Sequence, residues 1–396
     1  MTPDPFSQTD GPMIFISAAE PSADLHGASL IRAVHKIEPG ARFVGIAGPA
    51  MADAGCFTLH DMTRRSAMLV SALRNVGEGF KVLSITRRHF RRYRFSAAVL
   101  IDSPMLNLPL AKVAKAHRVP VLYYIAPQVW AWARYRVRRV RRRVDKMAVI
   151  LPFEERFFRE HRIDATYVGH PLFDTLAKRR PDRALQQTLR QSGEPVVALI
   201  PGSRGHVVDA VFPGQLAVAR SIAERYPGAF FPISVANDSV RRTIERLAGE
   251  SGLHCATYHG KNGDLLEAAD LVLVVSGTST LEVAYYHKPM VVMYNGSRLV
   301  YHLLARWLIS TPHLSLVNIL AGRELVPEFM PYYTSTEPIA RCALDLLDSP
   351  DKQQTMSREL ADLLAPIVKS GAPANAAAIL LDMLNTSCLP DRNGQP

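Results

Sequence analysis

Cysteine is scarce in this chain. Only four of its 396 residues are cysteine (Cys56, Cys255, Cys342 and Cys388), and none belongs to a C-x-x-C pair or a cysteine/histidine cluster. The sequence therefore indicates neither a disulfide framework nor a zinc site, and a reducing cytoplasm is expected. The polar start, MTPDPFSQTDGP, lacks the apolar core of a signal peptide.

Long apolar runs and paired aspartates are missing as well. The longest uncharged candidate, VPVLYYIAPQVWAWA, is interrupted by Pro120 and Pro127, whereas a membrane-spanning helix needs roughly 18 to 20 consecutive apolar residues. Any contact with a membrane would thus be peripheral. No Asp-x-Asp pair occurs to hold a metal on a diphosphate, so we expect neither a metal nor a cofactor.

Positive charge, in contrast, is in excess. The 47 lysines and arginines outnumber 36 acidic residues, which gives a formal net charge of +11. This balance favours a phosphate-bearing partner, a class that includes nucleic acid, anionic lipid and phosphorylated substrates. Charge alone leaves these three open.

Short apolar runs alternate with helical segments in both halves of the chain. They predict strands at MIFISA, RFVGIAG, AAVLID, VPVLYY and MAVIL, and again at PVVALI, AFFPISV, DLVLVVS and PMVVMY. Such alternation is typical of doubly wound parallel sheets, so we expect two facing Rossmann-like α/β domains with ligands at the carboxyl ends of the strands. The expected divisions are a first domain at 12–178, a second at 194–336, helices packing back on the domains at 337–387, and disordered ends at 1–11 and 388–396.

Two loops in the second half fit a nucleoside diphosphate. Each follows an apolar strand and precedes a helix, so helix-start N–H groups can face an anion, and Arg204 adds a charged donor. Glu282 could accept hydrogen bonds from ribose hydroxyls, although it could also only stabilise its helix, and the first loop could be an ordinary turn. The candidate residues are Gly202, Ser203, Arg204, Ser276, Gly277, Thr278 and Glu282.

The first half supplies candidate acid and base groups. AAEPSADLHG follows the first predicted strand and brings Glu20, Ser22 and Asp24 to its carboxyl end. AAVLID ends at Asp102, which is well placed to take a proton from an attacking hydroxyl, with helix capping as the alternative. For Asp24 we favour capping.

These motifs together resemble lipid-A-disaccharide synthase, an inverting, two-domain glycosyltransferase family of the GT-B type. The resemblance runs from about residue 13 to about residue 384 and rests on AEPSADLHGASLIRAV, ARFVGIAGPAMADAGC, the Asp102 segment, YIAPQVWAWARYRVRRV, LPFEERFF, VGHPL, PGSR, SGTSTLE and SLVNILAGRELV. Single short motifs would be weak, but so many in one order are specific.

The resemblance implies a reaction and roles for particular residues. The family joins UDP-2,3-diacylglucosamine to 2,3-diacylglucosamine 1-phosphate, giving a β-1',6-linked disaccharide 1-phosphate and UDP. By position, Asp102 corresponds to the general base, Glu20 and Ser22 belong to the N-terminal motif, and Arg204, Glu282 and Asn318 fall on positions associated with UDP. The implied partners are these two lipid substrates, with homo-oligomers left open.

Lipid substrates suggest a role for the cationic stretch that follows Tyr123. Tryptophan suits a membrane interface, and a basic segment is attracted to anionic lipid. We therefore expect a cytoplasmic protein that binds peripherally to the inner membrane. The cationic segment 86–95 and an interfacial helix at 299–309 would strengthen this binding. The alternatives are that the arginines form a solvated helix face and that the helix at 299–309 is buried. Trp130 and Trp132 could instead be core aromatics. The predicted surface comprises Trp130, Trp132, Arg138, Arg139, Arg141, Arg142 and Arg143.

Three departures from the family pattern lie in the first half. Ala19 and Ala23 replace glycines, Met105 replaces a second carboxylate near Asp102, and Leu69 stands where a glycine usually follows Met68. They motivate an alternative, a related UDP-sugar transferase with another lipid or glycan acceptor. A nucleic-acid-binding protein that uses the arginines is a remote alternative, and no nucleic-acid partner is expected.

Overall fold

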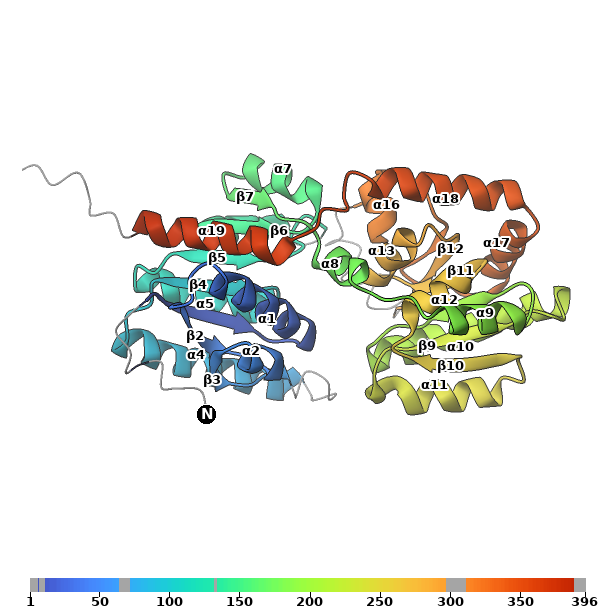
Figure 1. Cartoon of the computed structure of the whole chain (residues 1–396), viewed down its shortest axis with the longest axis horizontal. Helices are drawn as coiled ribbons and strands as arrows, with labels where there is room; N and C mark the ends of the chain where they lie inside the picture. Colours follow the sequence, from blue (N-terminus) through green and yellow to red (C-terminus); the bar gives the residue numbers. More distant parts are fainter. Residues whose placement is uncertain (1–5, 7–10, 64–71, 132–133, 297–310, 388–396) are drawn as a thin grey trace, which may run out of the picture. The chain divides into compact units, whose positions relative to one another are not determined.

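The computed structural model describes residues 6, 11–63, 72–131, 134–296 and 311–387. The chain forms two compact units, one of Met1–Asp174 with Lys369–Pro396 and the other of Thr175–Val368 (Figure 1). Each unit is built on its own parallel β-sheet.

The first unit contains a seven-stranded sheet in the order β3-β2-β1-β4-β5-β6-β7, with every pair parallel. Its strands are β1 (Met13–Ala18), β2 (Arg42–Ile46), β3 (Cys56–His60), β4 (Ala97–Ile101), β5 (Val121–Tyr124), β6 (Lys146–Val149) and β7 (Asp164–Tyr167). Its helices are α1 (Pro21–His35), α2 (Pro49–Asp53), α4 (Ala72–Arg92), α5 (Pro104–Ala116), the 3-10 helix η1 (Arg134–Arg136), α6 (Val137–Arg141), α7 (Pro152–Glu160) and α19 (Ala372–Ser387), while α8 (Pro171–Ala177) leads to the second unit.

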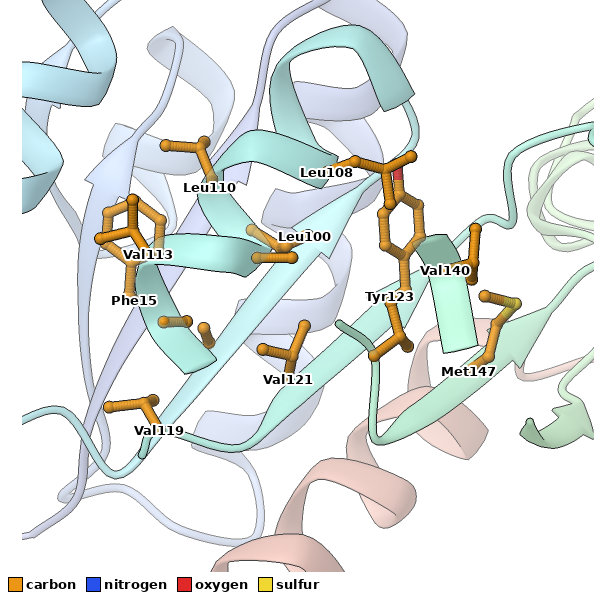
Figure 2. Packing of buried hydrophobic residues seen from close by; sticks show 14 of the residues in the cluster. Phe15, Leu100, Leu108, Leu110, Val113, Val119, Val121, Tyr123, Val140 and Met147 are labelled. Atoms are coloured by element: carbon orange, nitrogen blue, oxygen red, sulfur yellow. The ribbon is translucent and has the colours of Figure 1, made fainter. Parts of the chain in front are cut away.

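Helices cover both faces of this sheet. On one face α4, α5, α6 and α7 enclose a buried cluster, and Figure 2 shows Leu110 and Val113 of α5 packed with Leu100 of β4 and Val121 of β5. On the other face α1 and α19 enclose a second cluster, and these two helices lie side by side (Figure 1). The sheet is therefore the middle layer of three, as the doubly wound pattern predicts.

The second unit repeats the plan with the strand order β10-β9-β8-β11-β12-β13, again all parallel. Its strands are β8 (Val197–Ile200), β9 (Phe231–Val235), β10 (Cys255–His259), β11 (Leu271–Val275), β12 (Met290–Met293) and β13 (Glu328–Phe329). Its helices are α9 (Arg183–Gln191), α10 (Gly205–Arg225), α11 (Asp238–Glu250), α12 (Asn262–Ala268), α13 (Thr278–Tyr285), α16 (Leu316–Ala321), α17 (Glu337–Leu347) and α18 (Pro350–Leu364).

The C-terminal helices are shared between the two units. Helices α17 and α18 belong to the second unit, and α17 packs on α10. The chain then returns, and α19 packs on α1 of the first unit. Asp174 secures this return, because its carboxylate accepts hydrogen bonds from the backbone N–H groups of Gly371 and Ala372, at 2.5 and 2.9 Å.

Two segments differ from their expected local structure. The polar stretch 178–194 contains a helix, α9, whose N-cap Asp182 accepts a hydrogen bond from the Leu185 backbone N–H at 3.1 Å. The stretch 1–11 was expected to be disordered, but Phe6 within it stacks on Tyr93 with ring centroids 3.9 Å apart. No helix among the described residues is long and apolar enough to cross a membrane.

Candidate functional site

The order of strands creates a switch point in each sheet. In the first sheet β1 and β4 are neighbours, but the connections from them run to opposite sides. Crevices at such points, beyond the carboxyl ends of the strands, are where open α/β sheets bind ligands. Because Ala18 pairs with Ile101, the loops that begin with Ala19 and Asp102 start side by side at this edge.

Asp102 is held in an unusual and well-supported backbone conformation. Asp102 and Ser103 both have positive φ, at 49° and 44°, a left-handed region that is costly for non-glycine residues and that often occurs at functional sites. The buried Asn107 donates hydrogen bonds to the Ile101 and Asp102 carbonyls at 2.8 and 2.7 Å, and the Tyr123 hydroxyl donates to the Asp102 carbonyl at 2.6 Å. The backbone of the candidate base is therefore rigidly placed.

Two polar residues missed by the sequence interpretation build this support. The Ser17 hydroxyl of β1 donates to the Asn107 side-chain oxygen at 2.8 Å, so one amide joins β1, β4 and α5. Complete burial raises the pKa of Tyr123 well above its usual value, and the Asp102 charge acts in the same direction, so Tyr123 remains a hydrogen-bond donor. A polar residue in the apolar first turns of α5 is the sequence feature that could have identified Asn107.

The N-terminal motif divides into structural and accessible residues. Glu20 is the N-cap of α1 and half-buried, and Ser22 is exposed in the first turn. Asp24 is buried and accepts hydrogen bonds from the N–H groups of Gly48, Ala50 and Met51 at the start of α2, at 2.8, 2.9 and 3.2 Å. Asp24 therefore caps a helix, but this helix is α2 and not its own helix α1, which has no side-chain cap.

The departures from the family pattern have different structural settings. Neither Ala19 nor Ala23 has a positive φ, so these alanines carry no left-handed strain. Met105, in the first turn of α5, is 78% exposed and presents an apolar side chain beside the Asp102 loop. Met68 and Leu69 lie outside the described residues.

The second sheet places both predicted phosphate loops at its own switch point. Ile200 of β8 pairs with Val274 of β11, so the loops that follow these two strands are neighbours. Gly202 and Gly277 have φ values of 107° and 136°, which glycine adopts without a steric penalty. Neither α10 nor α13 has a side-chain N-cap, so the N–H groups of their first turns are free of that competitor for an anion.

The side chains of these loops are not all equally available. Ser203, Arg204 and Thr278 are exposed, while Ser276 is half-buried. The hydroxyls of Ser279 and Thr280 donate to the carbonyls of Val275 and Gly277, at 3.0 and 2.8 Å. The hydroxyls of Ser279 and Thr280 are therefore engaged within the loop, whereas the Arg204 side chain is accessible.

Glu282 belongs to a short polar relay at the same edge. The Asn262 side chain, at the start of α12, donates to Glu282 Oε2 at 3.1 Å, and the Ser234 hydroxyl of β9 hydrogen-bonds to the Asn262 side-chain oxygen. Burial raises the pKa of Glu282, while the Asn262 hydrogen bond and the Arg179 charge lower it. Sequence interpretation missed Asn262, because β10 was not recognised and the loop after it was not placed at this edge. Ser234 lies in the predicted strand AFFPISV, but its partner could not be expected without Asn262.

Asn318 is fully engaged inside the second unit. Its amide nitrogen donates to the Val326 carbonyl and to Glu328 at 2.8 and 3.0 Å, and its oxygen accepts the N–H groups of Leu325 and Val326 at 2.8 and 3.0 Å. The side chain is completely buried. Its direct effect is to tie α16 to the segment that leads into β13.

The proposed surface role of Trp130 is wrong. The residue is 6% exposed, and its ring packs edge-on against Phe153 and donates the indole N–H to Glu154 Oε1 at 2.9 Å. The alternative, a core aromatic, holds for Trp130 because its polar atom has a buried partner. Trp132 and the segment 299–309 lie outside the described residues.

Glu154 itself should make stability depend on pH. Burial raises its pKa to about 7, even though Trp130 and the N–H groups of Ile150 and Leu151 favour the carboxylate. The folded state then binds a proton that the unfolded state releases above its ordinary pKa of 4.5. The resulting contribution to the free energy of unfolding is fully present below pH 4.5 and is lost as the pH rises through 7. The loss is at most about 3 kcal/mol, at ~1.4 kcal/mol per pH unit.

Urea unfolding of the wild type and Glu154→Gln at about pH 5 and about pH 8 measures this effect. We expect the free energy of unfolding to fall more steeply with pH in the wild type than in the variant. Parallel pH profiles for the two proteins would show that Glu154 is ionised throughout.

The predicted arginines lie at the opposite edge of the first sheet from Asp102. Helix α6 and the residues after it lead into the amino end of β6, whereas Asp102 follows the carboxyl end of β4. The exposed members are Arg138, Arg139, Arg141 and Arg142, while Arg143 is half-buried. Arg138, Arg141 and Arg142 line a groove of about 910 Å³ together with Arg162 and Glu160.

Within the part of the chain that the structure describes, no group of three or more His, Cys, Asp and Glu side chains is placed to hold a metal ion. The polar groups at the two switch points are backbone N–H groups and an arginine, which donate hydrogen bonds, and carboxylates, which accept them.

Comparison with known proteins agrees with this arrangement. A sequence model of the family described as lipid-A-disaccharide synthetase matches residues 14–379. Lipid-A-disaccharide synthase from Syntrophus aciditrophicus is 37% identical over 381 residues, 95% of this chain and 98% of that protein. The protein of the same name from Geobacter sulfurreducens is 37% identical over 376 residues, 94% of this chain and 97% of that protein.

Solved structures show the fold. The crystal structure of Acinetobacter baumannii MurG matches with a TM-score of 0.54 and 13% identity, covering 95% of this chain and 100% of that one. The two Rossmann-like sheets with their C-terminal helices thus form a GT-B glycosyltransferase fold. With the family match over nearly its full length, the chain belongs to the lipid-A-disaccharide synthase family, whose activity serves lipid A biosynthesis.

Proposed function

We propose that this chain transfers a 2,3-diacylglucosamine unit from UDP to the 6-hydroxyl of 2,3-diacylglucosamine 1-phosphate, with inversion at the anomeric carbon. The products are the β-1',6-linked disaccharide 1-phosphate and UDP. The observation that carries the proposal is the placement of a carboxylate at the switch point of one sheet and of two glycine-containing loops at the switch point of the other.

On the acceptor side, Asp102 acts as general base. A carboxylate within reach of the acceptor hydroxyl takes its proton as the oxygen attacks the anomeric carbon and the bond to UDP breaks. The rigid backbone around Asp102 supports this role, because a fixed base loses little freedom on reaching the transition state. Glu20 and Ser22, in the neighbouring loop, contribute to acceptor binding.

On the donor side, the helix starts of α10 and α13 receive the diphosphate. Their first-turn N–H groups and Arg204 stabilise the negative charge that develops on the departing UDP. Gly202, Ser203, Ser276, Gly277 and Thr278 form the two loops. Glu282 accepts hydrogen bonds from the ribose hydroxyls, and Asn318 acts indirectly, by holding α16 in place.

Asn262 positions Glu282 for ribose recognition, and a binding cycle tests this. Because Asn262 holds one carboxylate oxygen, we expect Asn262→Ala to weaken UDP binding by roughly tenfold, about 1.4 kcal/mol. Binding of 2'-deoxy-UDP should change much less. Isothermal titration of both ligands to both proteins gives the cycle, and equal losses for the two ligands would assign Asn262 a purely structural role.

An anionic membrane surface is the proposed partner of the basic face, at the cytoplasmic side of the inner membrane. The exposed side chains of Arg138, Arg139, Arg141 and Arg142 support it, since each basic residue near anionic lipid contributes about 1 kcal/mol. Arg143 is partly withdrawn from this surface, and Trp130 does not belong to it.

The reaction is tested by mass spectrometry of purified protein with the two proposed substrates. A disaccharide 1-phosphate together with UDP supports the proposal. The exposed Met105 favours a second candidate, transfer from a UDP-sugar to a different lipid or glycan acceptor. UDP binding without disaccharide formation, but with transfer to another acceptor, would favour that candidate.

A further inference from the structure

A basic pocket separate from both switch points lies on the helical face of the first unit. It has a volume of about 400 Å³ and is lined by α4, α5 and the segment before β6. We propose that this pocket binds the phosphate of an anionic membrane phospholipid. The proposal rests on the membrane contact proposed above and gives that contact a discrete headgroup site.

Four permanent cations converge on the pocket. Arg87 and Arg91 come from α4, Lys112 comes from α5, and Arg143 comes from the segment before β6. No carboxylate is among the lining residues, and within the described chain Arg87, Arg91 and Lys112 form no ion pair. A phosphate with several acceptor oxygens can therefore satisfy these side chains without displacing a partner.

One of these cations is already oriented. The Arg143 guanidinium donates a hydrogen bond to the Leu108 carbonyl of α5 at 3.1 Å, and the residue is half-buried. Holding part of the guanidinium reduces the rotamer freedom that would be lost on binding. This contact distinguishes the pocket from a row of freely moving surface arginines.

The remainder of the lining is mostly aliphatic, with one imidazole. Leu83, Pro109, Val113 and Ala116 contribute apolar surface beside the cations, and His117 completes the lining. A glycerophospholipid has a phosphate next to a glycerol backbone and acyl chains, so its polar and apolar parts match both halves of the pocket. The volume lies within the ~300 to 1,000 Å³ typical of small-molecule sites.

An exposed aromatic on the same helix favours a membrane over a soluble phosphate. Phe80 of α4 is 66% exposed. It lies seven and eleven residues before Arg87 and Arg91, about two and three helical turns, so all three lie on one stripe of the helix. Aromatic and basic residues sharing an exposed helix face are typical of helices that lie in a membrane interface.

The pocket is not the acceptor site. The last turns of α4 and α5 lead into β4 and β5, so Arg91 and Lys112 lie toward the amino edge of the sheet, while Asp102 lies at the carboxyl edge. Loss of the pocket should therefore change lipid binding and leave the chemical step intact.

A matched pair of triple variants tests the proposal. Arg87→Ala/Arg91→Ala/Lys112→Ala removes three exposed pocket cations, and Lys81→Ala/Arg88→Ala/Arg92→Ala removes the same charge from exposed positions on α4 that do not line the pocket. Co-sedimentation uses phosphatidylcholine vesicles with and without phosphatidylglycerol. We expect the pocket variant to bind the anionic vesicles roughly tenfold more weakly than the matched variant.

Two further measurements separate the outcomes. Equal weakening of both variants would overturn the pocket and leave only diffuse attraction to the membrane. A larger loss of RNA binding than of vesicle binding would overturn the lipid assignment. In detergent micelles, the pocket variant should synthesise the disaccharide at the wild-type rate. Failure of the headgroup site is therefore distinguishable from failure of the proposed reaction. A loss of turnover by the pocket variant in micelles would contradict the separation of the pocket from Asp102.

Discussion

Asp102→Asn should lower kcat for disaccharide formation by about 10²- to 10⁴-fold, the range that a positioned general base contributes. Asparagine tolerates the left-handed backbone that Asp102 adopts, so the variant keeps the loop and loses the proton acceptor. UDP affinity should stay within about twofold, because the base acts on the acceptor hydroxyl, whereas the proposed nucleotide loops belong to the second unit. Turnover by mass spectrometry and UDP titration measure the two quantities.

Asp164→Asn provides a control for the change of charge. Asp164 is an exposed aspartate at the start of β7, away from the carboxyl edge of the sheet. This variant should retain wild-type kcat. Near-wild-type turnover by Asp102→Asn would remove Asp102 as the base and would direct attention to Glu20 in the adjacent loop.

Arg204→Ala should lower kcat/KM by about 10²- to 10³-fold, the cost of removing one preorganised donor to a developing negative charge. Arg204 is the N-cap of α10, and its exposed side chain adds a positive charge to the first-turn N–H groups. Arg204→Lys should recover only part of the loss, because an ammonium group retains the charge and loses the planar fork. Steady-state kinetics with the UDP-sugar, and UDP titration, follow the effect.

Arg220→Ala is the matched control for this prediction. Arg220 is exposed on the same helix, four turns from the loop, and should show unchanged kcat/KM. If Arg204→Ala weakens UDP binding and transition-state stabilisation equally, Arg204 acts by uniform binding. If it changes neither quantity, the helix starts alone hold the diphosphate.

The strands that the sequence predicted are those in the interior of the sheets. Each of the nine predicted apolar runs corresponds to an observed strand, from β1 at Met13–Ala18 to β12 at Met290–Met293. The four strands that were missed, β3, β7, β10 and β13, are the edge strands of the two sheets. Edge strands keep partly exposed side chains, as in β10, so they lack the continuous apolar run of a strand buried on both faces.

The candidate site was predicted unevenly for a related reason. Loops after recognised strands, such as those with Asp102, Gly202 and Gly277, could be assigned to the carboxyl edge from the order of elements. Asn262 follows the unrecognised β10, so its proximity to Glu282 could not be expected. For Trp130 the sequence led to a wrong prediction. Its position beside arginines in the sequence suggested a surface residue, but in the fold it is buried against Glu154.

The sequence by itself determined the doubly wound class and the family, and it located Asp102 and the two glycine-containing loops directly after predicted strands, because periodicity and glycine positions are properties of short segments. Tertiary structure alone decided which polar groups meet: Asn107 with the Asp102 carbonyl, Asn262 with Glu282, and Asp24 with the start of α2. It also placed the arginines and Asp102 at opposite edges of one sheet. These contacts join residues from separate elements, and their partners follow from strand order and register, which local sequence patterns do not encode.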